Sequence, residues 1–275
     1  MPKGLPARRT RGRRPALSIV GALVLVSVGA LGGAADATPV PSEAMPYFSD
    51  GSGAEPLAVG TALTKQRVVS TNSGTVVSVA SFAGSGDAGD YPKYSGAENG
   101  PRAVVSMVNT TETDALTPLS KGFFFGADIN TDAVSTGTIY DNGNNIFQRG
   151  LYGDRAQYKL QVDHGYAMCR VKGDTDTIAL TSKLLMPSGE WFRVRCYRSV
   201  QSTGDQLWLD VAPINRDGTL GTVVRSKSGI KWIGRLTFPI NTPVSIGGKL
   251  ISATQIHSQS DQFNGLIDNP VLDIG

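Results

Sequence analysis

The acidic residues are the first place to look for chemistry, because retaining hydrolysis of a glycosidic bond needs two carboxylates about 5 Å apart. On a strand, the pattern Glu-x-Asp-x-x-Glu places such carboxylates on one face. The glutamates of this chain are widely separated in sequence: Glu43, Glu55, Glu98, Glu112 and Glu190. We therefore expect no glucanase pair, and nothing in the sequence indicates an alternative pair of aspartates.

The two histidines offer little more. Gln255-Ile256-His257 matches a short motif of jelly-roll alginate lyases, but no tyrosine follows His257 as acid or base, so a loop position is favoured. Asp163-His164 lacks a G-x-S-x-G nucleophile turn, so His164 is expected in a turn of its own. Residues 84–89 satisfy G-x-G-x-x-G, but Pro92 excludes the helix that should follow, so a flexible loop is predicted. With the two cysteines expected in a disulfide, the two histidines leave no zinc cluster.

The first 37 residues are typical of a secretory signal peptide. Six basic residues come first, an apolar run from Ala16 to Leu31 follows, and Ala35-Asp36-Ala37 gives a small-x-small cleavage pattern. The apolar run is shorter than the roughly 20 residues that a spanning helix needs, so cleavage is favoured over an uncleaved anchor. We expect a secreted, extracellular protein without a membrane span after cleavage. Arg13-Arg14 leaves both general and twin-arginine export open.

Removal of this leader changes the charge of the chain. The whole sequence has 26 basic and 23 acidic residues and a net charge of +3. Without the six basic residues and Asp36 of the leader, 20 basic and 22 acidic residues remain, a net charge of −2. The positive charge therefore belongs to the leader, and nucleic acid is excluded as a favoured partner.

The rest of the chain reads as one large β domain. Residues 38–64, rich in Pro, Gly and Ser, are predicted to form a flexible lead-in, and residues 65–275 the domain itself. Short strand-like segments alternate with turn residues, and no amphipathic helix is evident, which favours a sandwich or barrel. The predicted strands are 76–80, 102–108, 122–129, 145–148, 158–162, 166–172, 191–198, 207–211, 243–246 and 265–272.

The two cysteines share the inward side of their predicted strands. Ala167, Cys169 and Val171 alternate with polar residues, as do Phe192, Val194 and Cys196. Because side chains alternate between the faces of a strand, both thiols point to the core. An even number of cysteines in a secreted chain predicts a disulfide between Cys169 and Cys196 on neighbouring strands, with two free buried thiols as the alternative.

Several motifs together resemble the laminin-G-like domains of the concanavalin A-like lectin/glucanase superfamily. They cover about residues 100–275, in the order that the family has. The Cys169–Cys196 arrangement also resembles secreted actinobacterial members with this fold. The matching segments are 123–129, 145–150, 189–194, 245–248 and 261–269.

The resemblance implies an all-β fold, a two-sheet antiparallel jelly-roll sandwich. In many laminin-G-like domains the aspartate of the closing motif helps to bind a structural calcium, and here that residue is Asp268. The alternative is an Asp268 that hydrogen-bonds a neighbouring turn without metal. Trp191 matches the family's core tryptophan and is interpreted as structural.

The sequence also contains one candidate sugar-binding surface. In the segment 207–211, Trp208 and Asp210 alternate with apolar residues, and Arg195 and Tyr197 have the same outward parity on their own strand. An aromatic ring beside charged groups suits a sugar. The alternative is a Trp208 that packs against arginine stems.

We therefore expect a secreted, non-catalytic module that binds a polysaccharide or a cell-envelope glycan, an interpretation that rests mainly on family resemblance. Two alternatives stay open. One is an extracellular structural or protein-interaction domain, and the other is a hydrolase or lyase with an unrecognised site.

Overall fold

The computed structural model of the chain describes residues 56–59, 62–82, 87–93, 97–109, 112, 114–132, 138 and 142–275. These residues all belong to one compact unit. The predicted signal peptide, residues 1–37, lies outside the described residues, and so does most of the predicted lead-in. No helix of the described part has the length and apolarity needed to cross a membrane.

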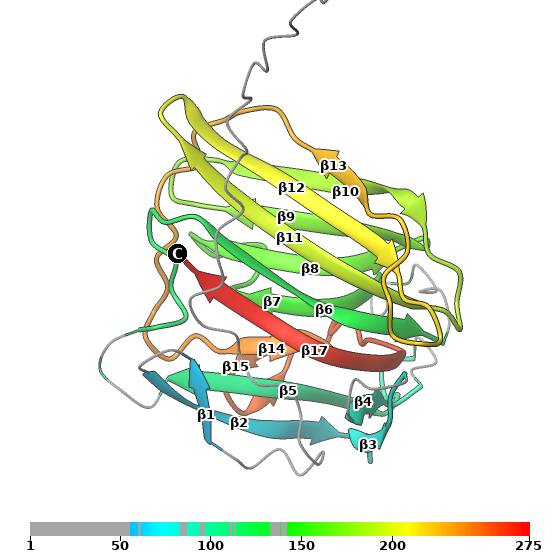
Figure 1. Cartoon of the computed structure of the whole chain (residues 1–275). Coiled ribbons are helices and arrows are strands. Elements are labelled where there is room, and N and C mark those ends of the chain that lie inside the picture. Colours follow the sequence, from blue (N-terminus) through cyan, green and yellow to red (C-terminus); the bar gives the residue numbers. More distant parts are fainter. Residues whose placement is uncertain are drawn as a thin grey trace, which may run out of the picture. The chain divides into compact units, whose positions relative to one another are not determined.

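The described chain is all-β and folds into two large antiparallel sheets with a small third one (Figure 1). The strands are β1 Pro56–Val59, β2 Ala62–Thr71, β3 Val77–Ala80, β4 Asp87–Tyr91, β5 Arg102–Asn109, β6 Phe123–Thr131, β7 Asn144–Arg149, β8 Gln157–Asp163, β9 Tyr166–Lys172, β10 Thr177–Leu185, β11 Trp191–Gln201, β12 Gly204–Pro213, β13 Val224–Lys227, β14 Val244–Ile246, β15 Leu250–Ser252, β16 Gln255–Ile256 and β17 Gly265–Ile274.

The predicted β-sandwich is confirmed. The eight-stranded sheet has the order β1-β2-β5-β14-β7-β8-β9-β10, and the seven-stranded sheet the order β13-β12-β11-β6-β17-β4-β3. The sheets pack face to face, and the final strand, β17, runs through the middle of the seven-stranded sheet (Figure 1). The strands β15 and β16 form a separate two-stranded hairpin.

The core lies between the two large sheets and consists of the alternating apolar residues that the strands turn inward. Along β8, Tyr158, Leu160 and Val162 are buried in it, and along β9 Ala167, Cys169 and Val171. Burying a leucine or valine side chain contributes about 1.5–3 kcal/mol, so the burial of the inner faces stabilises the packing of the two sheets. The hairpin between β8 and β9 turns at His164 and Gly165, both with positive φ (50° and 79°), as a two-residue turn of this kind requires.

The predicted disulfide between Cys169 and Cys196 is confirmed, with a Cα–Cα distance of 6.1 Å. Its position corrects one expectation. The two cysteines do not lie on neighbouring strands of one sheet, since β9 belongs to the eight-stranded sheet and β11 to the seven-stranded sheet. The bond therefore crosses the core and ties the two layers to each other.

Several strand boundaries differ from the expectations. Residues 87–89, expected in a flexible loop, begin strand β4, which pairs with β17 and β3. The strands β1 and β2 begin inside residues 38–64, expected as lead-in. The strand β10 had no predicted counterpart. Trp191 is not part of the core: it lies half-buried on the outward side of β11, edge-on to Phe82 at 5.0 Å between ring centroids.

Replacing both cysteines by alanine should lower the free energy of unfolding by roughly 3–4 kcal/mol, because the bond closes a loop of 27 residues in the unfolded chain. Guanidinium unfolding measures the loss. A reductant should shift the midpoint of the wild type toward that of the variant and leave the variant unchanged. A wild type that keeps its midpoint after verified reduction would contradict a stabilising bond across the sheets.

Candidate functional site

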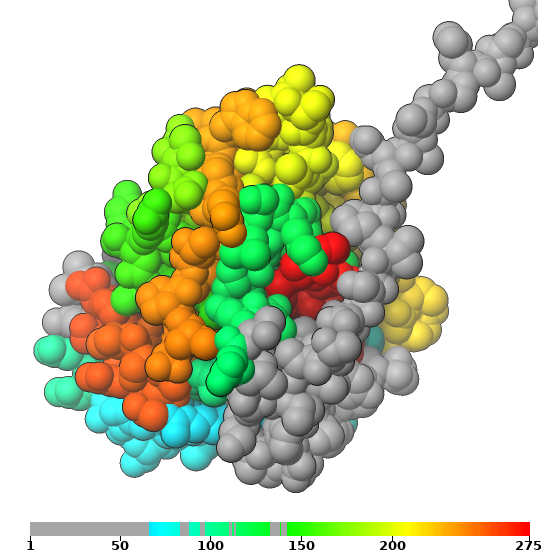
Figure 2. Space-filling model, turned by 90° about the vertical axis from the view of Figure 1, so that its left-hand side faces the viewer, coloured from blue at the N-terminus to red at the C-terminus, as the bar shows by residue number. Residues whose placement is uncertain are grey.

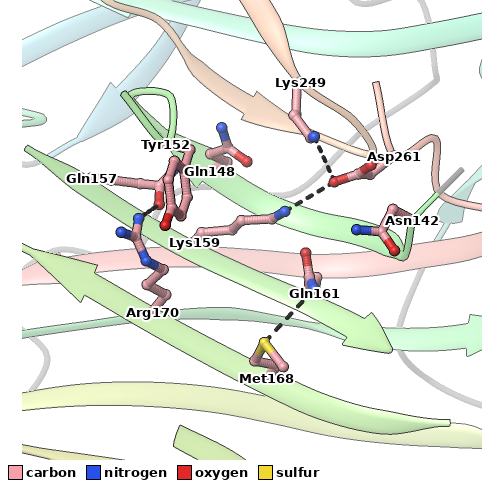
Figure 3. A pocket seen from close by; sticks show the side chains of 10 residues that line it. All are labelled: Asn142, Gln148, Tyr152, Gln157, Lys159, Gln161, Met168, Arg170, Lys249 and Asp261. Carbon is pink, nitrogen blue, oxygen red and sulfur yellow. Dashed lines mark hydrogen bonds and ion pairs between the residues drawn. The ribbon is translucent and has the colours of Figure 1, made fainter. Parts of the chain in front are cut away.

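A cavity of about 340 Å³ lies on the outer face of the eight-stranded sheet, on strands β7, β8 and β9. Figure 3 shows ten side chains that line it. Because Tyr158, Leu160 and Val162 point to the core, the residues between them on β8 point outward into this cavity. The lining residues are Asn142, Gln148, Tyr152, Gln157, Lys159, Gln161, Met168, Arg170, Lys249 and Asp261.

The floor of the cavity is a row of long polar side chains set by the strand register. Lys159 on β8 lies opposite Gln148 on β7 and opposite Arg170 on β9. One step along, Gln161 lies opposite Met168. Gln148, Gln157 and Gln161 are each less than 10 % exposed, so three carboxamides are buried on a face that contributes nothing to the core.

The walls come from two connections. On one side, Tyr152 from the loop between β7 and β8 is 78 % exposed and stacks on Arg170, whose Cζ lies 4.5 Å from the ring centroid. Arg170 also donates to Gln157 Oε1. On the other side, Lys249 and Asp261 belong to the segment that carries the β15–β16 hairpin. Figure 3 shows the side chains of Lys159 and Lys249 converging on Asp261.

The β15–β16 segment determines how far the outer face is open. Leu250 and Ile256 pack on Val69 of β2 and Val104 of β5. Arg67 of β2 donates to the carbonyl oxygen of Ala253 at 2.9 and 2.7 Å. The segment thus covers the part of the sheet that β2 and β5 form, and the β7–β9 part stays open beside it. Figure 2 shows the segment, in orange-red, lying against the light-blue β2.

A single carboxylate oxygen joins two lysines at the edge of the cavity. Asp261 Oδ2 lies 3.0 Å from Lys159 Nζ and 2.7 Å from Lys249 Nζ. The pKa of Lys159 is lowered to about 8, mainly by burial and to a smaller extent by the like charges of Lys249 and Arg170, against the attraction of Asp261. The protein therefore holds a lysine where its charged form is disfavoured, as functional sites often do.

Three acceptor oxygens of this site find no donor among the described residues. They are Gln148 Oε1, Gln161 Oε1 and Asp261 Oδ1, all covered from solvent. A buried acceptor without a partner costs about 1–3 kcal/mol. Gln148 also lines a second cavity, of about 470 Å³, which continues toward Thr242, Ser245 and Ser252.

The predicted sugar-binding residues do meet in space, on the other sheet. Tyr197 lies opposite Trp208, and Arg195 opposite Asp210. Trp208 is only 4 % exposed, however, because side chains of β13 lie over it: Arg225 Cζ and Lys227 Nζ are 5.0 and 4.7 Å from its ring. This is the packing against cationic stems that the sequence left open as the alternative, and ligand binding there stays a prediction.

The charged groups of that surface are also paired with one another. Asp210 accepts two hydrogen bonds of 2.6 Å from Arg225. Asp128 accepts hydrogen bonds from Arg193 at 2.8 Å and from Arg195 at 3.2 Å. The carboxylates of Asp128 and Asp210 are thus bound by arginines of the same sheet.

The surroundings of Asp268 do not fit a calcium ion. One of its oxygens accepts from Ser81 Oγ and the other from the backbone of Asn269, at 2.7 Å each. Its cross-strand partner Asp128 is bound by two arginines, whose positive charges oppose a cation. Within the described residues there is no group of three or more His, Cys, Asp or Glu side chains suited to a metal.

The histidines take the positions that the sequence favoured. His164 lies in the β8–β9 turn, with its Nδ1 2.7 Å from Asp163 Oδ1. His257 follows β16, where its Nδ1 accepts from the backbone of Gln259 at 3.0 Å. Neither lines the cavity on β7–β9.

The sequence interpretation missed that cavity. Its one signal was the polar set of alternate residues in the β8 and β9 segments, Lys159 and Gln161 beside Met168 and Arg170. That set reads as an ordinary solvated face until the covering segment is placed.

No protein-family model matches the sequence, and no curated protein is significantly similar to it. Among solved structures, the chain is similar to the LG1–3 region of the laminin α2 chain, with 8 % identity and a TM-score of 0.41 over 55 % of this chain and 27 % of that one. It is also similar to the binding domain of Paraclostridial Mosquitocidal Protein 1, with 12 % identity and a TM-score of 0.49 over 84 % and 48 %. A third is the enzymatically active domain of bacteriophage CBA120 tailspike protein 2, with 14 % identity and a TM-score of 0.43 over 73 % and 27 %.

The chain thus spans less than half the length of these three structures. Laminin LG domains are among the similar structures. Similarities of this size concern the fold and assign no function to the chain.

Replacing Lys159 by methionine should raise the free energy of unfolding at pH 7, on the order of 1–3 kcal/mol, because the variant no longer buries a disfavoured charge and Asp261 keeps Lys249. The pH dependence has a definite sign. The folded-state pKa is lowered from 10.5 to about 8, so between these values the unfolded chain binds more protons, and wild-type stability rises with pH. The difference in the free energy of unfolding between the variant and the wild type should therefore decrease above pH 8 and vanish near pH 10.5.

Guanidinium unfolding at pH 7, 9 and 10.5 measures this. The matched control is Lys183→Met, the same change at an exposed position, which should leave the free energy of unfolding nearly unchanged. A Lys159→Met variant that is less stable than the wild type at pH 7 would show instead that the ion pair with Asp261 is a net structural gain.

Proposed function

We propose that this protein is a secreted, non-catalytic carbohydrate-binding module whose ligand lies in the cavity on β7, β8 and β9. The observation that carries the proposal is the row of Gln148, Lys159 and Arg170 across three strands, with Gln157 and Gln161 beside it; the three glutamines are buried, and the two cations are half-buried. Carboxamides donate to and accept from sugar hydroxyls, and ammonium and guanidinium groups donate to them. None of these side chains contributes to the core.

The shape of the cavity supports a sugar ligand. A pyranose presents one apolar face and a rim of hydroxyl groups, so it suits an aromatic ring set beside polar side chains. Tyr152 offers such a ring at the rim, and the glutamines line the floor.

The cost of Lys159 supports a functional role for the site. A methionine or a glutamine fits a partly covered sheet face without a desolvated charge, yet this position holds a lysine whose pKa is lowered by burial. Natural proteins accept such local costs mainly where function needs them. A polysaccharide or cell-envelope glycan is the proposed ligand class.

A glycan array with the purified protein tests this proposal, and the variants locate the site. Tyr152→Ala and Gln161→Ala should each weaken binding about tenfold, equivalent to about 1.4 kcal/mol, because each removes a direct ligand contact. Trp208→Ala, on the opposite sheet, should bind as the wild type does.

The reverse pattern would move the site to the surface around Trp208, Asp210, Arg195 and Tyr197. Absence of glycan binding by the folded wild type would favour a protein-interaction domain. Release of reducing ends or unsaturated products from mixed polysaccharides would show an enzyme instead.

A further inference from the structure

The charges around the β7–β9 cavity do not balance. Three cationic side chains line it, Lys159, Arg170 and Lys249, against a single carboxylate, that of Asp261. The cavity therefore holds two positive charges in excess, although the sequence without its predicted leader has a net charge of −2. The excess belongs to this site and not to the protein as a whole.

The contacts show where the excess lies. Lys159 and Lys249 both approach the same oxygen of Asp261, so one carboxylate serves two ammonium groups. Arg170 forms no ion pair with any carboxylate of the described chain. Its contacts are the neutral Gln157 and the ring of Tyr152.

Other arginines of this protein are treated differently. Arg193 and Arg225 each bind a carboxylate through two nitrogens, and the fully buried Arg198 binds Asp205 at 2.8 Å. These residues make the planar two-point contact that a guanidinium offers to an anion. Arg170 keeps that capacity free on the floor of an open cavity.

We propose that the ligand of this cavity is an anionic glycan, whose carboxylate or sulfate group binds against Arg170 and Lys159. This inference rests on the proposed function. The neighbours Lys159 and Arg170, opposite each other on β8 and β9, form one cationic surface beside the sugar-binding glutamines.

A neutral sugar fits this cavity less well for a physical reason. A neutral sugar would shield Lys159 and Arg170 further from water without compensating their charge. Burying an uncompensated charge in a low-dielectric site has a large free-energy cost. An anionic group both relieves that cost and gains charge-assisted hydrogen bonds. The site thus favours an acidic glycan over the neutral glycan of the same shape.

The protonation of Lys159 makes the binding depend on pH. The charged groups facing Lys159 are Asp261 and Lys249 from the covering segment and Arg170 from β9, while β7 contributes the neutral Gln148. A bound anion stabilises the protonated lysine and raises its pKa. Affinity should therefore be constant below about pH 8 and fall above it, because binding then requires uptake of a proton.

A matched pair of ligands tests the inference. Calorimetry compares oligogalacturonate with the same oligosaccharide after reduction of its carboxyl groups, and dextran sulfate with dextran. We expect at least one anionic member to bind ten times more tightly than its neutral partner, with an affinity that falls with salt and above pH 8. The first pair reports on carboxylate and the second on sulfate.

Two variants locate the anion site. Arg170→Gln should lower the affinity for the anionic ligand about tenfold. The ratio between the affinities for the anionic ligand and its neutral partner should therefore fall. Arg216→Gln, the same charge change at an exposed residue outside this cavity, should leave both affinities unchanged.

The outcomes separate the two proposals. Equal binding of anionic and neutral partners, both weakened by Gln161→Ala, would overturn the anionic ligand and leave the carbohydrate-binding function standing. Stronger anion binding that Arg216→Gln weakens as much as Arg170→Gln would show a general charge effect and overturn the site. Binding of no glycan by the folded protein, on the array and in both pairs, would overturn both.

Discussion

The packing of two inward faces against each other is the constraint on which the rest of this structure depends. Along the core strands, every second side chain points to the core. The strand order then determines which of the remaining side chains lie next to each other on the outer faces. The disulfide between Cys169 and Cys196 joins β9 to β11 across that core and so links the two layers directly. The floor of the candidate site, on β7–β9, is the outward side of the same strands.

Buried ion pairs hold the connections between the strands in place. Arg198 pairs with Asp205 and also donates to the carbonyl oxygens of Leu119 and Gly234. It thus connects two loops to the end of the sandwich. Arg149 pairs with Asp114 at 2.8 Å and donates to the carbonyl oxygen of Thr242. Each pair is surrounded by further hydrogen bonds, the condition under which a buried pair is tolerated.

The outer faces of the two sheets differ in how many of their polar and charged groups have partners within the protein. On the seven-stranded sheet, Asp128 and Asp210 are bound by arginines, and Trp208 is covered by Arg225 and Lys227. On the eight-stranded sheet, a covering segment buries part of the face, and the cavity beside it keeps unpartnered acceptors and two cations in excess. The eight-stranded sheet carries the candidate site because its outer face has acceptors and positive charges without partners in the described part of the fold.

The sequence by itself determined that the chain is all-β, because apolar residues alternate within its short strands. It also determined the residues of the disulfide, because the chain has two cysteines and both take the inward positions of their strands. Even the missed strand β10 carried that signal, in Ile178, Leu180 and Leu184 at alternate positions. The tertiary structure decided the site. The alternation of residues predicts that Lys159 and Gln161 point away from the core. It does not predict that Asp261, 102 residues from Lys159 in the sequence, lies beside Lys159 at the edge of the cavity. Likewise, only strand order places Arg225 and Lys227 over Trp208, since burial of an outward side chain depends on neighbours that are distant in the chain.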